Sequence, residues 1–507
     1  MRNKAALALV LAVVSAGCPR RLERKVGRTL QTVDMEAPYL KCHMKTGEMY
    51  VLSAWKIDEA TRSIVGSGEL HGTDRRVESA RSYRVPFADV ALFETNTIVT
   101  SPAVAGLAVI AGLSAVVTTA CIIEPKNCFG SCPTFYAPDD HGGRPVLQAE
   151  GFSDAISPAL ESNDIDSLWR TTGRPGPFTL TMTNEAYETH VVKAADLLAV
   201  PRPPGGRVLA DGTDLWSASR VSQPTACTAP EGDCLAQVKL VDTDERSSLT
   251  DENDLAARET IELAFPPGSG SQQALVVAAR QSLVTTFLLY QGLAYLGTTA
   301  TSWLALLERG DTSARKGGRV LQKLGQIDVQ ILRDGEWHTV GDIYETGPIA
   351  TDVHLVMLPP GDAGERVRLS LPRGGWRIDS IALATITGKA TPIRLAPQTI
   401  SGTISPHYNA GRTPATTFPV VTMPGDRYEF GYTLPPQPAG TEYELFLDSR
   451  GYYLEWMRKE WLKEENPIAA LRMFVTPEQM LKELAPAYKK LEPKAEELFW
   501  RSRYAHP

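Results

Sequence analysis

Polar and apolar residues alternate with a period of two through much of the first hundred residues. This period is typical of half-buried β-strands, because successive side chains of a strand point to opposite faces of the sheet. The segments YLKCHM and EMYVLSAW flank Lys45-Thr46-Gly47, which predicts a hairpin, and further strand-like segments follow at SIVGSGEL, SYRVPF and VALFET. We therefore predict a small antiparallel β-domain over residues 35–98.

Two long uncharged runs interrupt this pattern, one near 102–123 and one near 281–308. The first follows Ser101-Pro102, a favourable start for a helix, and as a helix it would reach about 32 Å, enough to cross a bilayer. The second carries several Gln, Tyr, Ser and Thr residues, which disfavours a membrane span. We favour two buried apolar helices in a central β-rich body over residues 99–315. Insertion of both runs into a membrane is the alternative.

The second half of the chain returns to strands and then changes to a helical pattern. Five strand-like segments separated by Gly and Pro turns predict a β-sandwich-like domain over residues 319–395. Residues 396–437 are rich in Pro, Thr and Gly, and we predict them to be irregular apart from one strand at RYEFGYTL. Residues 438–507 place apolar residues at helical spacing, which predicts a helical C-terminal segment whose second helix begins at Thr476-Pro477-Glu478. The expected fold class is α+β, predominantly antiparallel β.

Several tryptophans invite a binding interpretation. Trp337 and Trp376 could bind carbohydrate on the sandwich-like unit, and Trp456, Trp461 and Trp500 could contact a partner protein. Aromatic residues at such spacings more often belong to the core, and we favour that interpretation for all five.

The N-terminus has the layout of a secretion signal over residues 1–17. Arg2 and Lys4 precede an apolar stretch from Ala5 to Val14, which is too short for a permanent membrane span and is followed by small residues. The following Ser-Ala-Gly-Cys, ending at Cys18, resembles a bacterial lipobox, although the family usually has Leu, Val or Ile where Ser15 stands.

The lipobox resemblance implies that Cys18 is acylated and anchors the mature chain in the lipid bilayer, at the periplasmic face or the cell surface. Ordinary cleavage that leaves Cys18 as a thiol is the alternative. We expect residues 18–34, which are polar, basic and without pattern, to form a tether. The net charge of −7 with mixed signs throughout argues against nucleic acid as a partner.

The cysteines other than Cys18 are even in number, which in an exported chain favours disulfides. The simplest pairing joins neighbours in sequence and then the remaining two: Cys128 with Cys132, Cys227 with Cys234, and Cys42 with Cys121.

Cys128 and Cys132 also lie in the densest group of chemically active residue types. A zinc set of Cys121, Cys128, Cys132 and His141 fits no standard spacing, and Asp139 and Asp140 without a repeated acidic pattern are weak calcium ligands. Gly-Ser-Cys132 superficially resembles the active-site run of papain-like proteases, but Pro133 replaces the aromatic residue and no histidine follows at the required distance. We expect no metal and no cofactor.

A second polar run, Asn184-Glu185-x-x-Glu188-x-His190, is expected on a strand. Glu188 and His190 would then share a face, with Glu185 on the other, so that an acid/base pair is geometrically feasible. We favour a solvated strand face with cross-strand partners. The alternative is an envelope hydrolase with a site at Asp139, Asp140, His141, Glu188 and His190. The common nucleotide-binding, zinc-protease and serine-hydrolase motifs are absent from the sequence.

The run NCFGSCPTFYAPDDHGGRPVLQAEGF, followed by TMTNEAYETHVV, resembles a pattern in uncharacterised bacterial lipoproteins. The resemblance covers about 75 residues and implies an exported lipoprotein module without implying any activity. We therefore predict an exported bacterial lipoprotein with a non-catalytic binding or structural role at the cell envelope, with an envelope protein or glycan as partner. The hydrolase and a membrane-inserted assembly component are the alternatives.

Overall fold

A computed structural model of the chain describes most of the residues that follow the signal-like segment. These are residues 20–27, 29–44, 48–71, 77–100, 132–140, 144–153, 155–156, 161–266, 272–297, 325–344, 347–360, 365–408, 412–455 and 464–501. Cys18, the first apolar run, Cys121, Cys128 and His141 lie outside these ranges. The described chain is mostly antiparallel β-sheet with a few helices, which confirms the predicted fold class.

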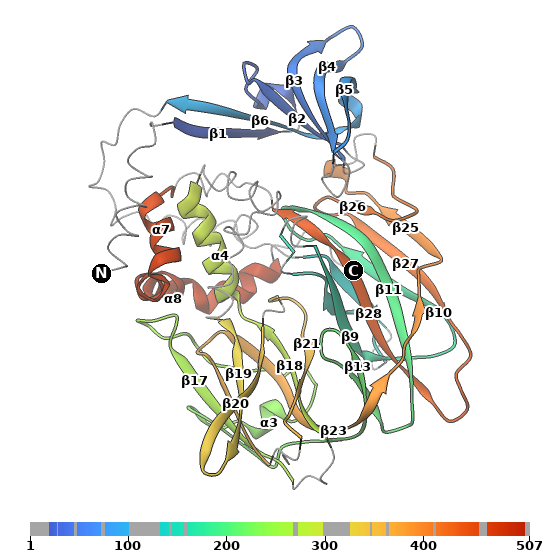
Figure 1. The fold of residues 1–507 in the computed structure, drawn as a ribbon, viewed down its shortest axis with the longest axis vertical. Coiled ribbons are helices and arrows are strands. Elements are labelled where there is room, and N and C mark those ends of the chain that lie inside the picture. The colour runs from blue at the N-terminus through green and yellow to red at the C-terminus, as the bar shows by residue number, and fades with distance from the viewer. Residues whose placement is uncertain are drawn as a thin grey trace.

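The N-terminal unit is one six-stranded antiparallel sheet with its own core (Figure 1, blue). In spatial order its strands are β1 (Arg20–Gly27), β6 (Val90–Thr100), β2 (Tyr39–Met44), β3 (Met49–Asp58), β4 (Ser63–His71) and β5 (Val77–Pro86). The β2–β3 hairpin is confirmed, whereas the sheet extends beyond the predicted small β-domain because it begins at Arg20. The tether prediction is wrong for β1, which pairs with β6 from Arg20 to Gly27. Strand pairing uses main-chain hydrogen bonds, so a strand at a sheet edge needs no apolar alternation.

Two further sheets pack face to face as a first β-sandwich, at the right of Figure 1. One sheet contains β25 (Thr399–Thr403), β27 (Arg427–Leu434), β10 (Gly176–Thr183), β7 (Thr134–Pro138) and β8 (Pro145–Glu150). The other contains β24 (Ile393–Leu395), β11 (Glu188–Arg202), β28 (Glu442–Glu455), β9 (Ser162–Gly173) and β26 (Val420–Thr422), which pairs with β11. Buried residues such as Phe135, Leu180, Phe430 and Leu445 fill the space between the sheets.

A second sandwich is inserted into the first between β11 and β24, and Figure 1 shows it below the first. One of its sheets contains β12 (Arg207–Ala210), β13 (Leu215–Ser222), β23 (Trp376–Ala390), β18 (Gln273–Gln281), β21 (Asp352–Met357) and β16 (Arg246–Ser247). The other contains β15 (Gly232–Asp233), β14 (Ala226–Ala229), β17 (Arg258–Ala264), β22 (Arg366–Pro372), β19 (Ile327–Arg333) and β20 (Glu336–Ile343). A short helix, α3 (Leu235–Val238), follows β15.

Three helices form a separate cluster at the left of Figure 1: α4 (Leu283–Leu296), α7 (Pro467–Val475) and α8 (Pro477–Arg501). The described part of the second apolar run therefore does form a buried helix, which begins where the Ser282 side chain accepts a hydrogen bond from the Val284 backbone N–H. The predicted start of the second C-terminal helix is confirmed at Pro477. Within the described residues, no helix combines the length and the apolar character that a membrane span requires.

The predicted domain boundaries differ from the observed ones. The five strands predicted in 319–395 exist, but they divide between both sheets of the second sandwich and pair there with strands from the predicted central body. The predicted irregular stretch holds β25 and β26 as well as the expected β27.

The helical prediction is wrong at Glu442–Glu455, where β28 is a central strand flanked by β11 and β9. A strand buried on both faces shows no clear alternation, so its pattern is ambiguous between strand and helix.

Candidate functional site

The predicted acidic turn after β7 is held in place by neighbouring residues. The Arg170 Nη2 atom donates to Asp139 Oδ2 at 2.7 Å, and the Thr172 backbone N–H donates to Asp140 Oδ2 at 2.8 Å. Both partners belong to β9. These contacts give the two aspartates a structural role in joining β7 to β9.

Glu188 and His190 lie on one face of β11, as predicted, with His190 Nε2 and Glu188 Oε1 2.9 Å apart. Glu185 accepts a 2.6 Å hydrogen bond from the Tyr136 hydroxyl, in a separate buried group. The favoured interpretation of a solvated strand face is wrong, because both side chains of the pair are at most 1% exposed. Residues of a central strand that pack under other elements are buried whatever their polarity.

The predicted hydrolase site falls into two distant groups among its described residues, while His141 lies outside the described ranges. On the central strand β28, Glu444 pairs with Thr172, next to the Asp139 contacts, whereas Tyr453 pairs with His190. Nine residues of strand at ~3.3 Å each separate the two groups by about 30 Å. In the part of the chain that the structure covers, no three His, Cys, Asp or Glu residues come together as metal ligands would.

The cysteine predictions are confirmed for one pair, Cys227–Cys234, a disulfide buried in the second sandwich. Cys132 is buried, and its predicted partner Cys128 lies outside the described residues. Cys42 is buried in the N-terminal sheet, where burial raises the pKa of its thiol to about 12. Because Cys121 also lies outside the described residues, the Cys42–Cys121 pair stays a prediction.

The core interpretation of the tryptophans is confirmed for Trp376 and Trp500, but not for Trp337, which lies outside the described core clusters. Trp376 is fully buried, and its indole N–H donates to the Gly325 carbonyl at 2.7 Å. Trp337 is half-buried beneath the Arg368 guanidinium, 4.1 Å from the ring centre, and Trp500 packs against the helical cluster. Trp456 and Trp461 lie outside the described residues.

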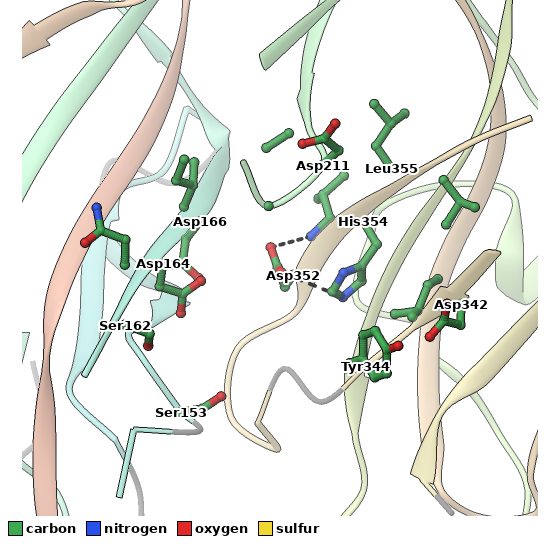
Figure 2. A pocket seen from close by; sticks show the side chains of 17 residues that line it. Ser153, Ser162, Asp164, Asp166, Asp211, Asp342, Tyr344, Asp352, His354 and Leu355 are labelled. Carbon is green, nitrogen blue, oxygen red and sulfur yellow. Dashed lines mark hydrogen bonds and ion pairs between the residues drawn. The ribbon is translucent and has the colours of Figure 1, made fainter. Parts of the chain in front are cut away.

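A cavity of about 290 Å³ lies where the two sandwiches meet. Its walls come from β9 of the first sandwich and from β20, β21 and the turn after β12 of the second (Figure 2). We call it the inter-sandwich cleft, and it is lined by Ser153, Ser162–Asp166, Ala210–Gly212, Asp342–Tyr344 and Asp352–Val356.

The inter-sandwich cleft is acidic. Its described lining contains Asp164, Asp166, Asp211, Asp342 and Asp352 but neither lysine nor arginine. Carboxylates gathered around a partly enclosed space focus a negative potential that attracts cations.

Asp166 is the most perturbed of these acids. The residue is 5% exposed, and its buried Oδ2 atom has no hydrogen-bond partner. Burial raises the pKa of this carboxyl well above its usual range, and the charges of Asp164, Asp352 and Glu150 raise it further. A buried polar atom without a partner costs about 1–3 kcal/mol of stability, so the fold tolerates Asp166 at a cost.

His354 and Asp211 of the cleft also have shifted pKa values. Burial lowers the pKa of His354, against the opposing effect of Asp352 3.7 Å away, so the imidazole is neutral at pH 7. The pKa of Asp211 is lowered: burial opposes the change, but hydrogen bonds from the Asp214 backbone N–H and the Trp216 indole N–H, the latter at 2.7 Å, outweigh it. Asp211 is therefore ionised.

Sequence reasoning did not identify this cleft. Asp164 and Asp166 are two residues apart on β9, and Asp352 and His354 are two apart on β21, so each pair shares a strand face. These two pairs, each with a spacing of two residues, were the only local signals in the sequence that pointed to the cleft. Their convergence depends on β9 and β21 lying side by side, although one belongs to each sandwich.

Comparisons with known proteins leave the family open. No protein-family model and no curated protein matches the chain. Among solved structures, the secreted serine protease VesC from Vibrio cholerae is 10% identical, with a TM-score of 0.13, over 70% of this chain and 97% of that one. A Salmonella alpha-2-macroglobulin mutant is 8% identical, with a TM-score of 0.09, over 73% of this chain and 30% of that one. Neither score is high enough to carry an argument about fold or function.

Proposed function

We propose that the protein is an exported, lipid-anchored bacterial envelope protein with a non-catalytic binding role, and that the inter-sandwich cleft is its ligand site. The single observation that carries the binding role is this cleft, in which the buried carboxyl of Asp166 has an unpaired oxygen. Ligand sites favour such interfaces between domains, where two rigid units form a concave surface.

The architecture favours binding over catalysis at this site. Most of the cleft residues lie on strands, which hold side chains more precisely than loops do. Aspartates outnumber every other polar residue type in the lining, which suits the binding of a cation.

The location rests on the N-terminal sequence and on the disulfide. A bacterial protein forms a stable disulfide such as Cys227–Cys234 in an oxidising compartment outside the cytoplasm. The lipobox-like sequence ending at Cys18 would supply the anchor in the lipid bilayer. An envelope protein or glycan remains a proposed partner of the anchored molecule.

Lipid labelling tests the anchor directly. We expect the full chain, expressed in a bacterium fed an alkyne-labelled palmitate, to take up label and to fractionate with membranes. Cys18→Ala should lose the label, because the acylated atom is gone. Ser15→Leu, which brings the sequence closer to the lipobox, should keep it. Label that persists in Cys18→Ala would place the acylation elsewhere and refute the anchor.

A further inference from the structure

We propose that the inter-sandwich cleft binds a linear organic cation with two or more ammonium groups, of the polyamine type. This inference rests on the proposed function, since it names the class of ligand that the cleft takes. It goes beyond the sequence-based expectation of an envelope protein or glycan.

The acids lie on opposite walls of the cleft. Asp164 and Asp166 belong to β9 of the first sandwich, whereas Asp352 lies on β21 and Asp342 on β20 of the second (Figure 2). Asp211 lies in the turn after β12. A cation with a single charge could pair with one wall only, but a linear cation with separated charges can pair with both.

One oxygen of the buried Asp166 carboxyl has no hydrogen-bond partner among the described residues. Asp166 Oδ2 has no partner, and the residue is 95% buried, since only 5% of its surface is exposed. An ammonium group carries three donors and a positive charge, so on binding it would pair with Asp166 as that carboxyl gives up its proton, and with the acids around it.

A compact metal ion fits the cleft less well. Calcium requires six to eight oxygen ligands at about 2.3–2.6 Å, and no three acidic or histidine side chains in the described part of the chain converge in that way. The cavity of 290 Å³ is also far larger than one ion needs. Apolar side chains, including Val353, Leu355 and Val356, line it among the aspartates and would contact the methylene groups of a polyamine.

The described lining of the cleft contains no basic side chain that is charged at neutral pH. Neither lysine nor arginine is among the lining residues that the structure describes, and His354 is neutral at pH 7 because burial lowers its pKa.

Calorimetric titration of the purified full chain in detergent with spermidine tests the proposal, at pH 7.5 and low salt. We expect saturable binding at one site per chain. Asp166→Asn and Asp352→Asn should each weaken it at least tenfold, since each removes a carboxylate with which the bound cation would pair, on a different wall. Asp334→Asn is the matched control, because Asp334 is an exposed acid in the β19–β20 turn outside the cleft, and it should bind as the unaltered protein does.

Three results of this titration would overturn the proposal. The cleft assignment fails if spermidine does not saturate, or if Asp334→Asn weakens binding as much as Asp166→Asn does. The polyamine assignment fails if calcium alone binds at the same stoichiometry with the same dependence on Asp166. The titration does not depend on acylation of Cys18, so a negative result here is distinguishable from failure of the lipid anchor.

Discussion

Asp166 and the pair of Glu188 and His190 are all buried polar residues, but their surroundings differ. His190 and Glu188 contact each other at 2.9 Å, which is the usual way in which a folded protein retains buried ionisable groups. Asp166 has an unpaired oxygen and acidic neighbours. The contrast shows why titratable residue types in a sequence do not by themselves identify a binding site: their partners come from distant strands.

Asp166 should make stability fall as pH rises. The pKa of Asp166 is raised in the folded state, so the folded protein holds this proton more tightly than the unfolded chain does. Proton binding therefore stabilises the fold at low pH, and this contribution to the free energy of unfolding is lost as pH rises from about 4 toward the raised pKa. Asp166→Asn removes the effect. We expect it to increase the free energy of unfolding by about 1–3 kcal/mol at pH 8 and to have little effect at pH 4.

Urea denaturation of both proteins at the two pH values measures this difference. Asp334→Asn serves as the control, since an exposed turn residue should change stability by less than about 0.5 kcal/mol at either pH. An equal effect of Asp166→Asn at pH 4 and pH 8 would show that ionisation is not the cause.

At the scale of elements, the sequence predicted local structure well and long-range pairing poorly. Helix α8 was predictable because its Pro477 start and its alternating charges are local signals. Strand β28 was not, because it is buried through its pairing with β11 and β9, which lie far away in sequence. Strand β1 was missed for the same reason, since its pairing with β6 gives no local pattern.

The Cys227–Cys234 disulfide closes a short loop between β14 and α3. The loop-closure entropy of a loop of this length predicts a stabilisation of about 2–3 kcal/mol. We expect the double variant Cys227→Ala with Cys234→Ala to lower the free energy of unfolding by that amount. Urea denaturation of both proteins without reductant measures it, and equal stabilities would contradict a stabilising role for this disulfide.

The helical cluster depends on contacts between α4 and α8, where the rings of Phe287 and Tyr488 lie 5.1 Å apart. Phe287→Ala should cost about 3–5 kcal/mol, because it leaves a cavity among buried side chains. Ile468→Ala on α7 is the control, since Ile468 is 61% exposed and its truncation should cost little. Thermal denaturation compares them, and equal costs would contradict the described packing.

At the scale of the whole molecule, the insertion of one sandwich into the other places β9 beside β21 and so forms the cleft. The sequence predicted a sandwich-like unit, yet it could not show that residues 207–390 interrupt another sandwich. The strands β11 and β24 that flank the insertion pair only in the folded chain, through Leu197 and Leu395 among others.

Proton release on spermidine binding tests the central claim, that the inter-sandwich cleft is a cation site built around Asp166, most directly. Calorimetry near neutral pH in buffers of different ionisation enthalpy counts the protons. The titratable groups that face Asp166 and the cleft are Glu150, Asp164, Asp211, Asp342, Tyr344, Asp352 and His354. We predict release of up to one proton per spermidine from the unaltered protein, because the ammonium favours the ionised Asp166, and almost none from Asp166→Asn. Equal proton release from both proteins would contradict the account.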